Sequence, residues 1–169
     1  GHVAARCGYD AQVGGNIGKP ALDLASPREN TLYVLELSSY QLDLTPSLRP
    51  DVAVLLNISP DHLDRHGGMD GYVATKKRIF ALQGARDLAV IGVDDRHAAE
   101  ICTLVSSRAG GPTVAPVAIG QVVGRGVYVL NGTLYDGRCS PPVDILDVHT
   151  ATALPGAHNW QNAAAAYAA

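Results

Sequence analysis

The stretch Leu32-Tyr33-Val34-Leu35-Glu36-Leu37-Ser38-Ser39-Tyr40-Gln41-Leu42 decides the fold, because it joins a short apolar run to a carboxylate and then to a helical turn. Such runs, bounded by polar residues, predict strands that are buried on both faces of a parallel sheet. Val52-Ala53-Val54-Leu55-Leu56 and Leu88-Ala89-Val90-Ile91-Gly92-Val93 are two further runs of this kind. We therefore expect at least three parallel strands.

Helical patterns lie between and after these runs. Residues 69–82 and 94–105 predict amphipathic helices, and the alternation of strand and helix predicts a doubly wound, mainly parallel α/β sheet flanked by helices. Later, Asn131-Gly132 lies between Val127-Tyr128-Val129-Leu130 and Thr133-Leu134-Tyr135, which predicts a hairpin with a type I′ turn. We expect a small antiparallel region at one edge of the sheet.

The composition limits the class of protein. The 169 residues are 47% hydrophobic and 17% charged, which suits a single globular domain. A net charge of -3 with scattered basic residues argues against nucleic acid as a partner. No apolar stretch approaches the roughly 20 residues that a membrane span needs. Cys7, Cys102 and Cys139 include no CxxC motif, so we expect three reduced, buried structural thiols in a cytoplasmic protein.

Both ends of the sequence are expected to be cut. The opening residues 3–8 are typical of the last turns of a helix, with Arg6 and a closing Gly8 but no helix start. The final residues 163–169 are alanine-rich and begin a helix without ending it. The simplest interpretation is a piece of a larger protein.

Two polar segments at the ends of predicted strands are candidates for a cation site. Glu36 follows one apolar run, and Asn57 with Asp61-His62-Leu63-Asp64 follows the next. If the two strands are neighbours, Glu36 and His62 lie together at the rim of the sheet, where α/β proteins bind ligands. A buried Glu36 needs a partner, either a metal ion or an arginine, and the two are equally compatible with its position.

The other residues around these strands have simpler interpretations. Ser38 and Ser39 can cap a helix or face a phosphate. Asp61 and Asp64 can cap the coming helix, and His66 is expected to be a solvated loop residue. Lys76 belongs to a basic cluster that is ordinarily solvated, although a period of 3.6 residues aligns it with Tyr72 and the apolar side of its helix. A neutral, desolvated amine there could take up carbon dioxide and form a carbamate, which can bind a metal.

A glycine-rich segment, Gly14-Gly15-Asn16-Ile17-Gly18-Lys19-Pro20, fails as a phosphate-binding loop. Val13 stands where the first glycine of GxxxxGK[ST] would be, and Pro20 replaces the hydroxyl residue. We expect a tight turn with a close backbone approach and a helix that starts near Pro20.

Taken together and in order, five motifs closely resemble the central, ATP-binding domain of the Mur ligase family. They are the glycine-rich segment 14–18, residues 36–42, Asn57 with residues 61–64, residues 72–78, and Gly156-Ala157-His158-Asn159 with Gln161-Asn162-Ala163. The resemblance covers residues 1–169 and implies a partial central domain, of the P-loop NTPase-like type and truncated at its start, without the family's N-terminal UDP-binding and C-terminal domains. The variants GGNIG and ELSSYQL point to the branch that adds D-glutamate to UDP-N-acetylmuramoyl-L-alanine.

The resemblance also implies roles for individual residues. Glu36 would bind the magnesium ion shared with ATP, and His62 with carbamylated Lys76 would hold a second Mg2+. Asn16, Ser38 and Gln41 would contact the UDP-sugar substrate, and Asn16, His62 and Lys76 would be the catalytic residues. The residues implied at the ATP pocket are His158, Asn159 and Asn162.

The implied reaction is transfer of a phosphoryl group from ATP to the alanyl carboxylate, followed by attack of the D-glutamate amine on the acyl phosphate. The family's phosphate loop would precede Gly1, so the 169 residues alone are expected to be inactive as a ligase, to bind ATP weakly, and to be unstable or to pair with a second copy. Three alternatives stay open: a folylpolyglutamate synthetase-like ligase, a metal-dependent hydrolase built on Glu36, His62 and Asp64, and a non-catalytic module.

Overall fold

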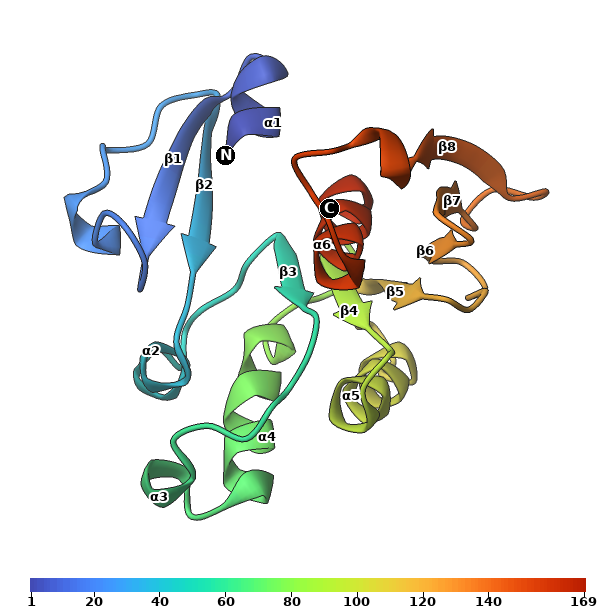
Figure 1. Ribbon diagram of the computed structural model, residues 1–169. Helices are drawn as coiled ribbons and strands as arrows, with labels where there is room; N and C mark the ends of the chain where they lie inside the picture. Colours follow the sequence, from blue (N-terminus) through green and yellow to red (C-terminus); the bar gives the residue numbers. More distant parts are fainter. The chain divides into compact units, whose positions relative to one another are not determined.

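The computed structural model describes residues 1–169, which divide into two compact units, residues 1–46 and 47–169 (Figure 1). The composition favoured a single domain. The contacts within the chain separate one short unit from one that is more than twice its length, and the single domain stays a prediction.

The first unit consists of two parallel strands and three short helical segments. Strands β1 (Asp10–Gly15) and β2 (Thr31–Glu36) pair from Asp10 opposite Thr31 to Gly15 opposite Glu36. The helical segments are α1 (His2–Arg6), η1 (Ala21–Asp23) and α2 (Ser39–Leu44). The prediction of a helix that starts near Pro20 is therefore wrong, because only a 3₁₀ turn forms there. Pro27 follows closely and disfavours a helical conformation at the residue before it.

Strand β2 is confirmed as a strand, but the prediction that it is buried on both faces is wrong. The side chains of Leu32, Tyr33, Val34 and Leu35 are 37–40% exposed. Glu36 is exposed as well, so its carboxylate does not carry the desolvation cost that the sequence interpretation assumed. A two-stranded sheet with two short helices has too little chain to cover both of its faces.

The second unit contains a six-stranded sheet in the order β3-β4-β5-β6-β7-β8. Its first four strands are parallel, and β6, β7 and β8 are antiparallel. The strands are β3 (Val52–Leu55), β4 (Leu88–Gly92), β5 (Thr113–Ile119), β6 (Val127–Leu130), β7 (Thr133–Asp136) and β8 (Val143–Asp147). The helical segments are α3 (Leu63–His66), α4 (Met69–Lys77), η2 (Arg78–Phe80), α5 (Arg96–Ser106), η3 (Val148–Thr150) and α6 (Ala157–Ala168).

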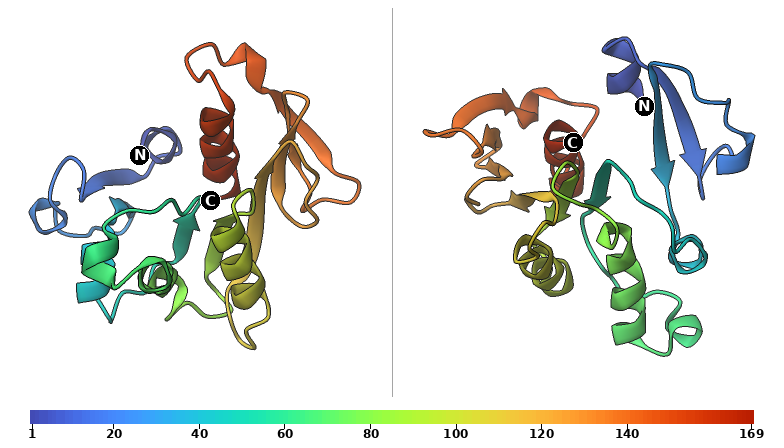
Figure 2. Two further views of the ribbon diagram at one scale, coloured as in Figure 1. Left: turned by 60° about the horizontal axis from the view of Figure 1, so that its bottom comes forward. Right: turned by 180° about the vertical axis from the view of Figure 1, so that it is seen from behind.

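Helices cover both faces of this sheet, which confirms the doubly wound α/β class. One core joins Ala89 and Ile91 of β4 to α4, η2 and α5, and the other joins Val90 of β4 to β5, β6 and α6. Figures 1 and 2 show α6 on one side of the sheet and α4 and α5 on the other. Strand β4 is thus buried on both faces, as predicted. Strand β3 lies at the edge and buries only Ala53 and Leu55, whereas Val52 and Val54 are about 40% exposed.

The predicted hairpin is confirmed between β6 and β7. Leu130 pairs with Thr133, and the two residues between them have positive φ angles, 50° at Asn131 and 80° at Gly132. Asparagine and glycine are the residues that tolerate this conformation best, so the turn chemistry fixes the register of the hairpin.

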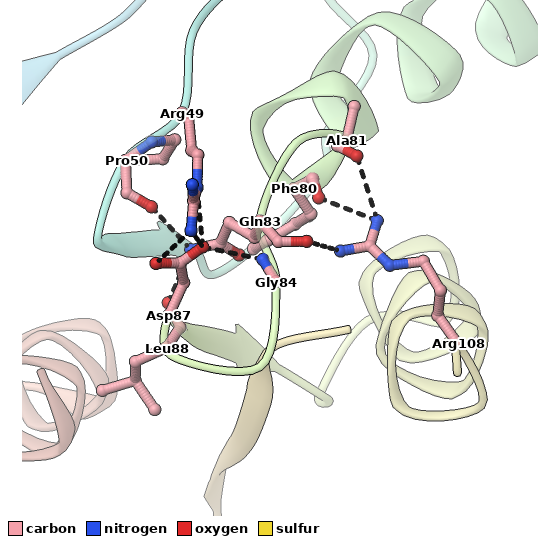
Figure 3. A network of polar contacts seen from close by, with 9 residues as sticks. All are labelled: Arg49, Pro50, Phe80, Ala81, Gln83, Gly84, Asp87, Leu88 and Arg108. Atoms are coloured by element: carbon pink, nitrogen blue, oxygen red, sulfur yellow. Dashed lines mark hydrogen bonds and ion pairs between the residues drawn. The ribbon is translucent and has the colours of Figure 1, made fainter. Parts of the chain in front are cut away.

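A polar network holds the start of β4 (Figure 3). Asp87, which is 4% exposed, accepts hydrogen bonds from the Gly84 N–H at 2.7 Å and from Arg49 Nε at 3.1 Å. The Gly84 N–H and, to a smaller extent, Arg49 lower the pKa of Asp87. Gln83 Nε2 donates to the carbonyls of Pro50 and Leu88 at 3.1 and 2.9 Å. These bonds tie the loops before β3 and β4 together.

The cysteines correct one prediction and confirm another. All three are free thiols, as expected, but only Cys102 is buried, whereas Cys7 and Cys139 are exposed. None of the helices has the length and the apolar character that crossing a bilayer requires.

A second polar cluster ties the end of α6 to β7. Arg138 donates to both carboxylate oxygens of Asp136, at 2.9 and 2.8 Å, and to the Ala168 carbonyl at 3.1 Å. Tyr167 adds a hydroxyl bond to Asp136 at 3.2 Å. The bond from Arg138 is the main cause that lowers the pKa of Asp136 to about 2.

The pKa of Asp136 predicts a loss of stability in acid. A carboxyl group with a lowered folded-state pKa stabilises the fold fully above its unfolded value, roughly 3.9, and loses this contribution as the pH falls through about 2. We expect Asp136→Asn to lower the free energy of unfolding by about 2 kcal/mol at pH 6, and the difference from the unsubstituted chain to shrink between pH 4 and pH 2. Urea unfolding followed by circular dichroism measures both, and a difference that does not change with pH would contradict the prediction.

Candidate functional site

The predicted site residues of the first unit gather at the carboxyl ends of β1 and β2. We call Asn16, Glu36, Ser38 and Gln41 the β2 group. The Asn16 N–H donates to the Glu36 carbonyl at 2.8 Å, so the loop after β1 lies directly against the end of β2. Ser38 and Gln41 follow within five residues of Glu36.

The glycines before Asn16 make this close approach possible. A Cβ at Gly15, whose φ is 119°, would collide with the Glu36 carbonyl, and one at Gly14 would collide with the Lys19 carbonyl. The close backbone approach expected from the sequence is therefore confirmed. The groups that these glycines approach are backbone carbonyls of the same chain.

Ser38 and Gln41 form a capping box at the start of α2. The Ser38 hydroxyl accepts from the Gln41 N–H at 3.3 Å, and Gln41 Oε1 accepts from the Ser38 N–H at 2.9 Å. The sequence left two uses open for Ser38, capping a helix or facing a phosphate, and the structure shows the capping. Contact of either side chain with a substrate stays a prediction.

His62 and Lys76 belong to a second cluster, the α3–α4 group, together with Asp61, His66 and Tyr72. His62 is the residue before α3 and adopts a left-handed backbone, with φ 50° and ψ 35°. Its Nε2 lies 3.3 Å from Asp61 Oδ2, and both side chains are about half exposed. The Asp61 carboxylate is therefore a neighbour of the His62 imidazole. His62 stands at the N-cap of α3 and its side chain makes no capping hydrogen bond, and the capping interpretation of Asp61 stays a prediction.

Tyr72 is the buried centre of the α3–α4 group. Lys76 Nζ lies 5.6 Å from the centre of its ring, on the apolar side of α4, and Lys76 is half-buried whereas Lys77 is exposed. Burial, and to a smaller extent the negative charge of Asp61, raise the pKa of Tyr72. The tyrosine thus lies near both Lys76 and the carboxylate that pairs with His62. As an ammonium, Lys76 is stabilised by the ring.

His66 is not the solvated loop residue that the sequence predicted. It ends α3, lies 5.5 Å from the Tyr72 ring between ring centres, and places Nδ1 3.4 Å from the Thr75 hydroxyl. The misjudgement arose because α3 is only four residues long and packs on α4 through its carboxyl end, which no periodicity in the sequence predicts.

The third predicted set lies on α6. His158 and Asn162 are exposed, and Asn159 Nδ2 donates to the Pro155 carbonyl at 2.8 Å. Between them, Gln161 is 5% exposed and is bonded to Asn57 and Asp94. Asn57 and Asp94 follow β3 and β4, so this helix reaches the carboxyl ends of parallel strands, where α/β proteins bind ligands.

Sequence reasoning missed Asp94, and it quoted Gln161 within a motif without assigning it a role. A signal existed for both. Asp94 follows the apolar run of β4 as Glu36 follows that of β2, and Gln161 precedes the buried Ala164 and Ala165 by three and four residues, which places a polar side chain on the buried face of the helix.

The three sets are divided between the two units. The β2 group lies in residues 1–46, and the α3–α4 group and α6 lie in residues 47–169. Strands β2 and β3 belong to separate sheets, one in each unit. A common site of Glu36, His62 and Lys76 stays a prediction.

The described side chains could supply only some of the ligands that a magnesium ion needs. Exposed carboxylates are present at Glu36 and at Asp61 beside His62, but no group of three or more His, Cys, Asp or Glu side chains lies together. Magnesium usually keeps several water molecules and is held by one or two carboxylates and by substrate phosphates, so this sparse donor set suits it better than a metal that needs a full protein cage.

Comparison with known proteins decides the family. Residues 9–169 match the family model of the Mur ligase middle domain. The chain belongs to this family. It is similar to the UDP-N-acetylmuramoylalanine–D-glutamate ligase of Caulobacter vibrioides, with 58% identity over the whole chain and 36% of the relative, and to that of Rhodospirillum rubrum, with 48% identity over the whole chain and 35% of the relative. The Mur ligase chain thus spans about a third of the length of these curated relatives.

Solved structures agree on the fold. The chain matches a UDP-N-acetylmuramoyl-L-alanyl-D-glutamate–2,6-diaminopimelate ligase with a TM-score of 0.69 at 22% identity, over 99% of this chain and 38% of that one. MurF from Acinetobacter baumannii gives a TM-score of 0.56 at 23% identity, over 84% of this chain and 31% of that one. At such low identity these likenesses concern the Mur ligase fold alone.

The packing of α3 on α4 makes a prediction at Gly71. A Cβ on this residue would collide with the His66 carbonyl. We expect Gly71→Ala to push α3 away from α4 and to lower the free energy of unfolding by roughly 1–3 kcal/mol, the usual cost of overpacking. Urea unfolding measures the loss, and NMR shifts of the His66 and Tyr72 rings report the displacement.

Gly124→Ala is the matched control, because nothing lies within 4 Å of a Cβ there and no positive φ is required. Equal unfolding free energies for the two alanine variants would show that α3 does not depend on the close approach at Gly71.

Proposed function

We propose that this chain is the central domain of an ATP-dependent ligase that adds D-glutamate to UDP-N-acetylmuramoyl-L-alanine in the synthesis of peptidoglycan precursors. The observation that carries the proposal is 58% identity over all 169 residues to a protein named for this ligation. The same name favours this reaction over a folylpolyglutamate synthetase-like ligase, a metal-dependent hydrolase or a non-catalytic module. A cytoplasmic location belongs to the proposal.

The proposed reaction has two steps. The alanyl carboxylate of the UDP-sugar attacks the γ-phosphorus of ATP, which gives an acyl phosphate and ADP. The amine of D-glutamate then attacks the acyl carbon, and an amide bond forms as phosphate and a proton leave. Both steps depend mainly on positioning and on neutralising negative charge.

The β2 group would bind and orient the UDP-sugar end of the substrate. Asn16 offers an exposed amide beside the end of β2, and Ser38 lies two residues after Glu36. Since the capping box already uses Ser38 and Gln41, it would hold their side chains in one orientation before substrate arrives.

Magnesium would be held by Glu36 at one position and by His62 and a carbamylated Lys76 at a second, where it would neutralise phosphate charge. The carbamate would form when a neutral Lys76 amine adds to carbon dioxide and loses a proton. Lys76 is half-buried, and its charge would change from positive to negative. His158, Asn159 and Asn162 of α6 would line the ATP pocket.

A chimera tests the proposed function directly. Residues 1–169 replace the matched segment of the Caulobacter vibrioides ligase, and phosphate release from ATP is measured. We expect release that requires both UDP-N-acetylmuramoyl-L-alanine and D-glutamate and that stops when EDTA removes magnesium. A folded chimera that releases phosphate without D-glutamate, or none at all, would overturn the proposal.

Two adjacent lysines of this chimera test the role of the α3–α4 group. Lys76→Ala removes the proposed ligand and is expected to reduce kcat by about 100-fold or more. Lys77→Ala, the matched control on the exposed side of the helix, should stay within about twofold of the unsubstituted chimera. Equal activities of the two variants would exclude a special role for Lys76.

A further inference from the structure

The fully buried apolar residues of α6 are all alanines, and Trp160 is the one large apolar side chain of the helix that packs, only partly buried, against the same core. Ala164, Ala165 and Ala168 are at most 4% exposed and pack against β4, β5 and β6. Helices pack on their neighbours through ridges of side chains, and alanine methyl groups form only shallow ridges. Apart from Trp160, apolar packing therefore specifies the rotation of the first turns of this helix weakly, whereas its last turn is held by the bonds of Arg138 and Tyr167.

Gln161 is the single polar side chain on the buried face of α6. Its Oε1 accepts from Asn57 Nδ2 at 2.7 Å, and its Nε2 donates to Asp94 Oδ2 at 2.9 Å. One amide thus connects the first half of α6 to the residues that follow β3 and β4.

Asp94 fixes the orientation of the Gln161 amide, because its carboxylate can only accept hydrogen bonds. The carboxylate accepts from the Ile119 N–H at 3.1 Å and from Gln121 Nε2 at 3.2 Å, and it has nothing to donate. Gln161 must therefore turn its NH2 group towards Asp94, which leaves its oxygen for Asn57. A buried amide with both ends matched holds its helix more specifically than methyl packing does.

We propose that Gln161 is a positioning residue of the nucleotide site: through Asn57 and Asp94 it fixes the first two turns of α6 and so places Asn159 and Asn162 for an adenine nucleotide. Asn159 is two residues before Gln161, and Asn162 is the next residue after it. A small rotation of the helix would move both amides together. The nucleotide part of this inference rests on the proposed function, whereas the fixing of α6 does not.

The first test reverses the donor and the acceptor and uses the 169-residue chain. Gln161→Glu places a carboxylate against Asp94, and we expect amide hydrogen exchange of residues 158–163 at pH 7.5 to become about tenfold faster or more. The double variant Gln161→Glu/Asp94→Asn restores a matched pair, so exchange should return to within about twofold of the original. In the single variant the effect should shrink at lower pH, as a proton comes to be shared between the two carboxyl groups.

Gln83→Glu is the matched control. Gln83 is 4% exposed and bonds two carbonyls near the start of β4, whereas Asp94 follows the end of this strand. It should speed exchange around residues 83–88 and leave 158–163 unchanged. Equal acceleration of 158–163 by both single variants, or no recovery in the double variant, would overturn the proposal.

The second test uses the chimera and separates this inference from the proposed function. Gln161→Glu should raise the KM for ATP about tenfold with a much smaller change in kcat, the double variant should restore KM, and Gln83→Glu should leave it unchanged. An active chimera whose KM for ATP does not respond to Gln161→Glu would overturn the nucleotide part. Failure of the unsubstituted chimera would instead count against the proposed function, and the exchange experiment would still decide whether Gln161 fixes α6.

Discussion

The burial of strand β4 is the constraint on which the second unit depends. Residues 89–92 are buried on both faces, with Ala89 and Ile91 in one core and Val90 in the other. A strand in this position leaves polar backbone groups at both ends that have to be paired. Before the strand, Gln83 of the Asp87 network donates to the Leu88 carbonyl, and after the strand the Val93 N–H donates to the Val117 carbonyl at 2.9 Å. The Asp94 side chain, one residue further on, binds Gln161 of α6. Loops and helices from distant parts of the sequence thereby converge on one strand.

The two networks have different consequences for function. The network at Asp87 joins loops on the side of the sheet away from the carboxyl ends of the parallel strands, and it contributes to stability. The network at Asp94 joins α6 to the carboxyl ends of β3 and β4, where the family's ligand chemistry is proposed. The α3–α4 group follows β3 on the same side, and its buried Tyr72 lies near both Lys76 and Asp61.

Much of this arrangement could be predicted from the sequence, for physical reasons that are local. Continuous apolar runs predicted β2, β3 and β4, and Asn131-Gly132 predicted the hairpin, because turn chemistry and apolar content act within a few residues. The degree of burial could not be predicted in the same way. Leu32 and Val52 lie in runs as apolar as β4 but are about 40% exposed, since coverage depends on which other elements reach each face. The same limit explains the error at His66, whereas the error at Pro20 has a local cause, because Pro27 disfavours a helical conformation at the residue before it.

The sequence by itself determined the doubly wound class, the ordered motifs of the Mur ligase family and the residue types available for chemistry, because these depend on local pattern and on identity. Only the tertiary structure decided that Glu36 is exposed and that Gln161 is bonded to Asn57 and Asp94. Asn57 and Gln161 are 104 residues apart in the chain. Contacts over such separations arise from packing of the whole unit, which no local pattern encodes.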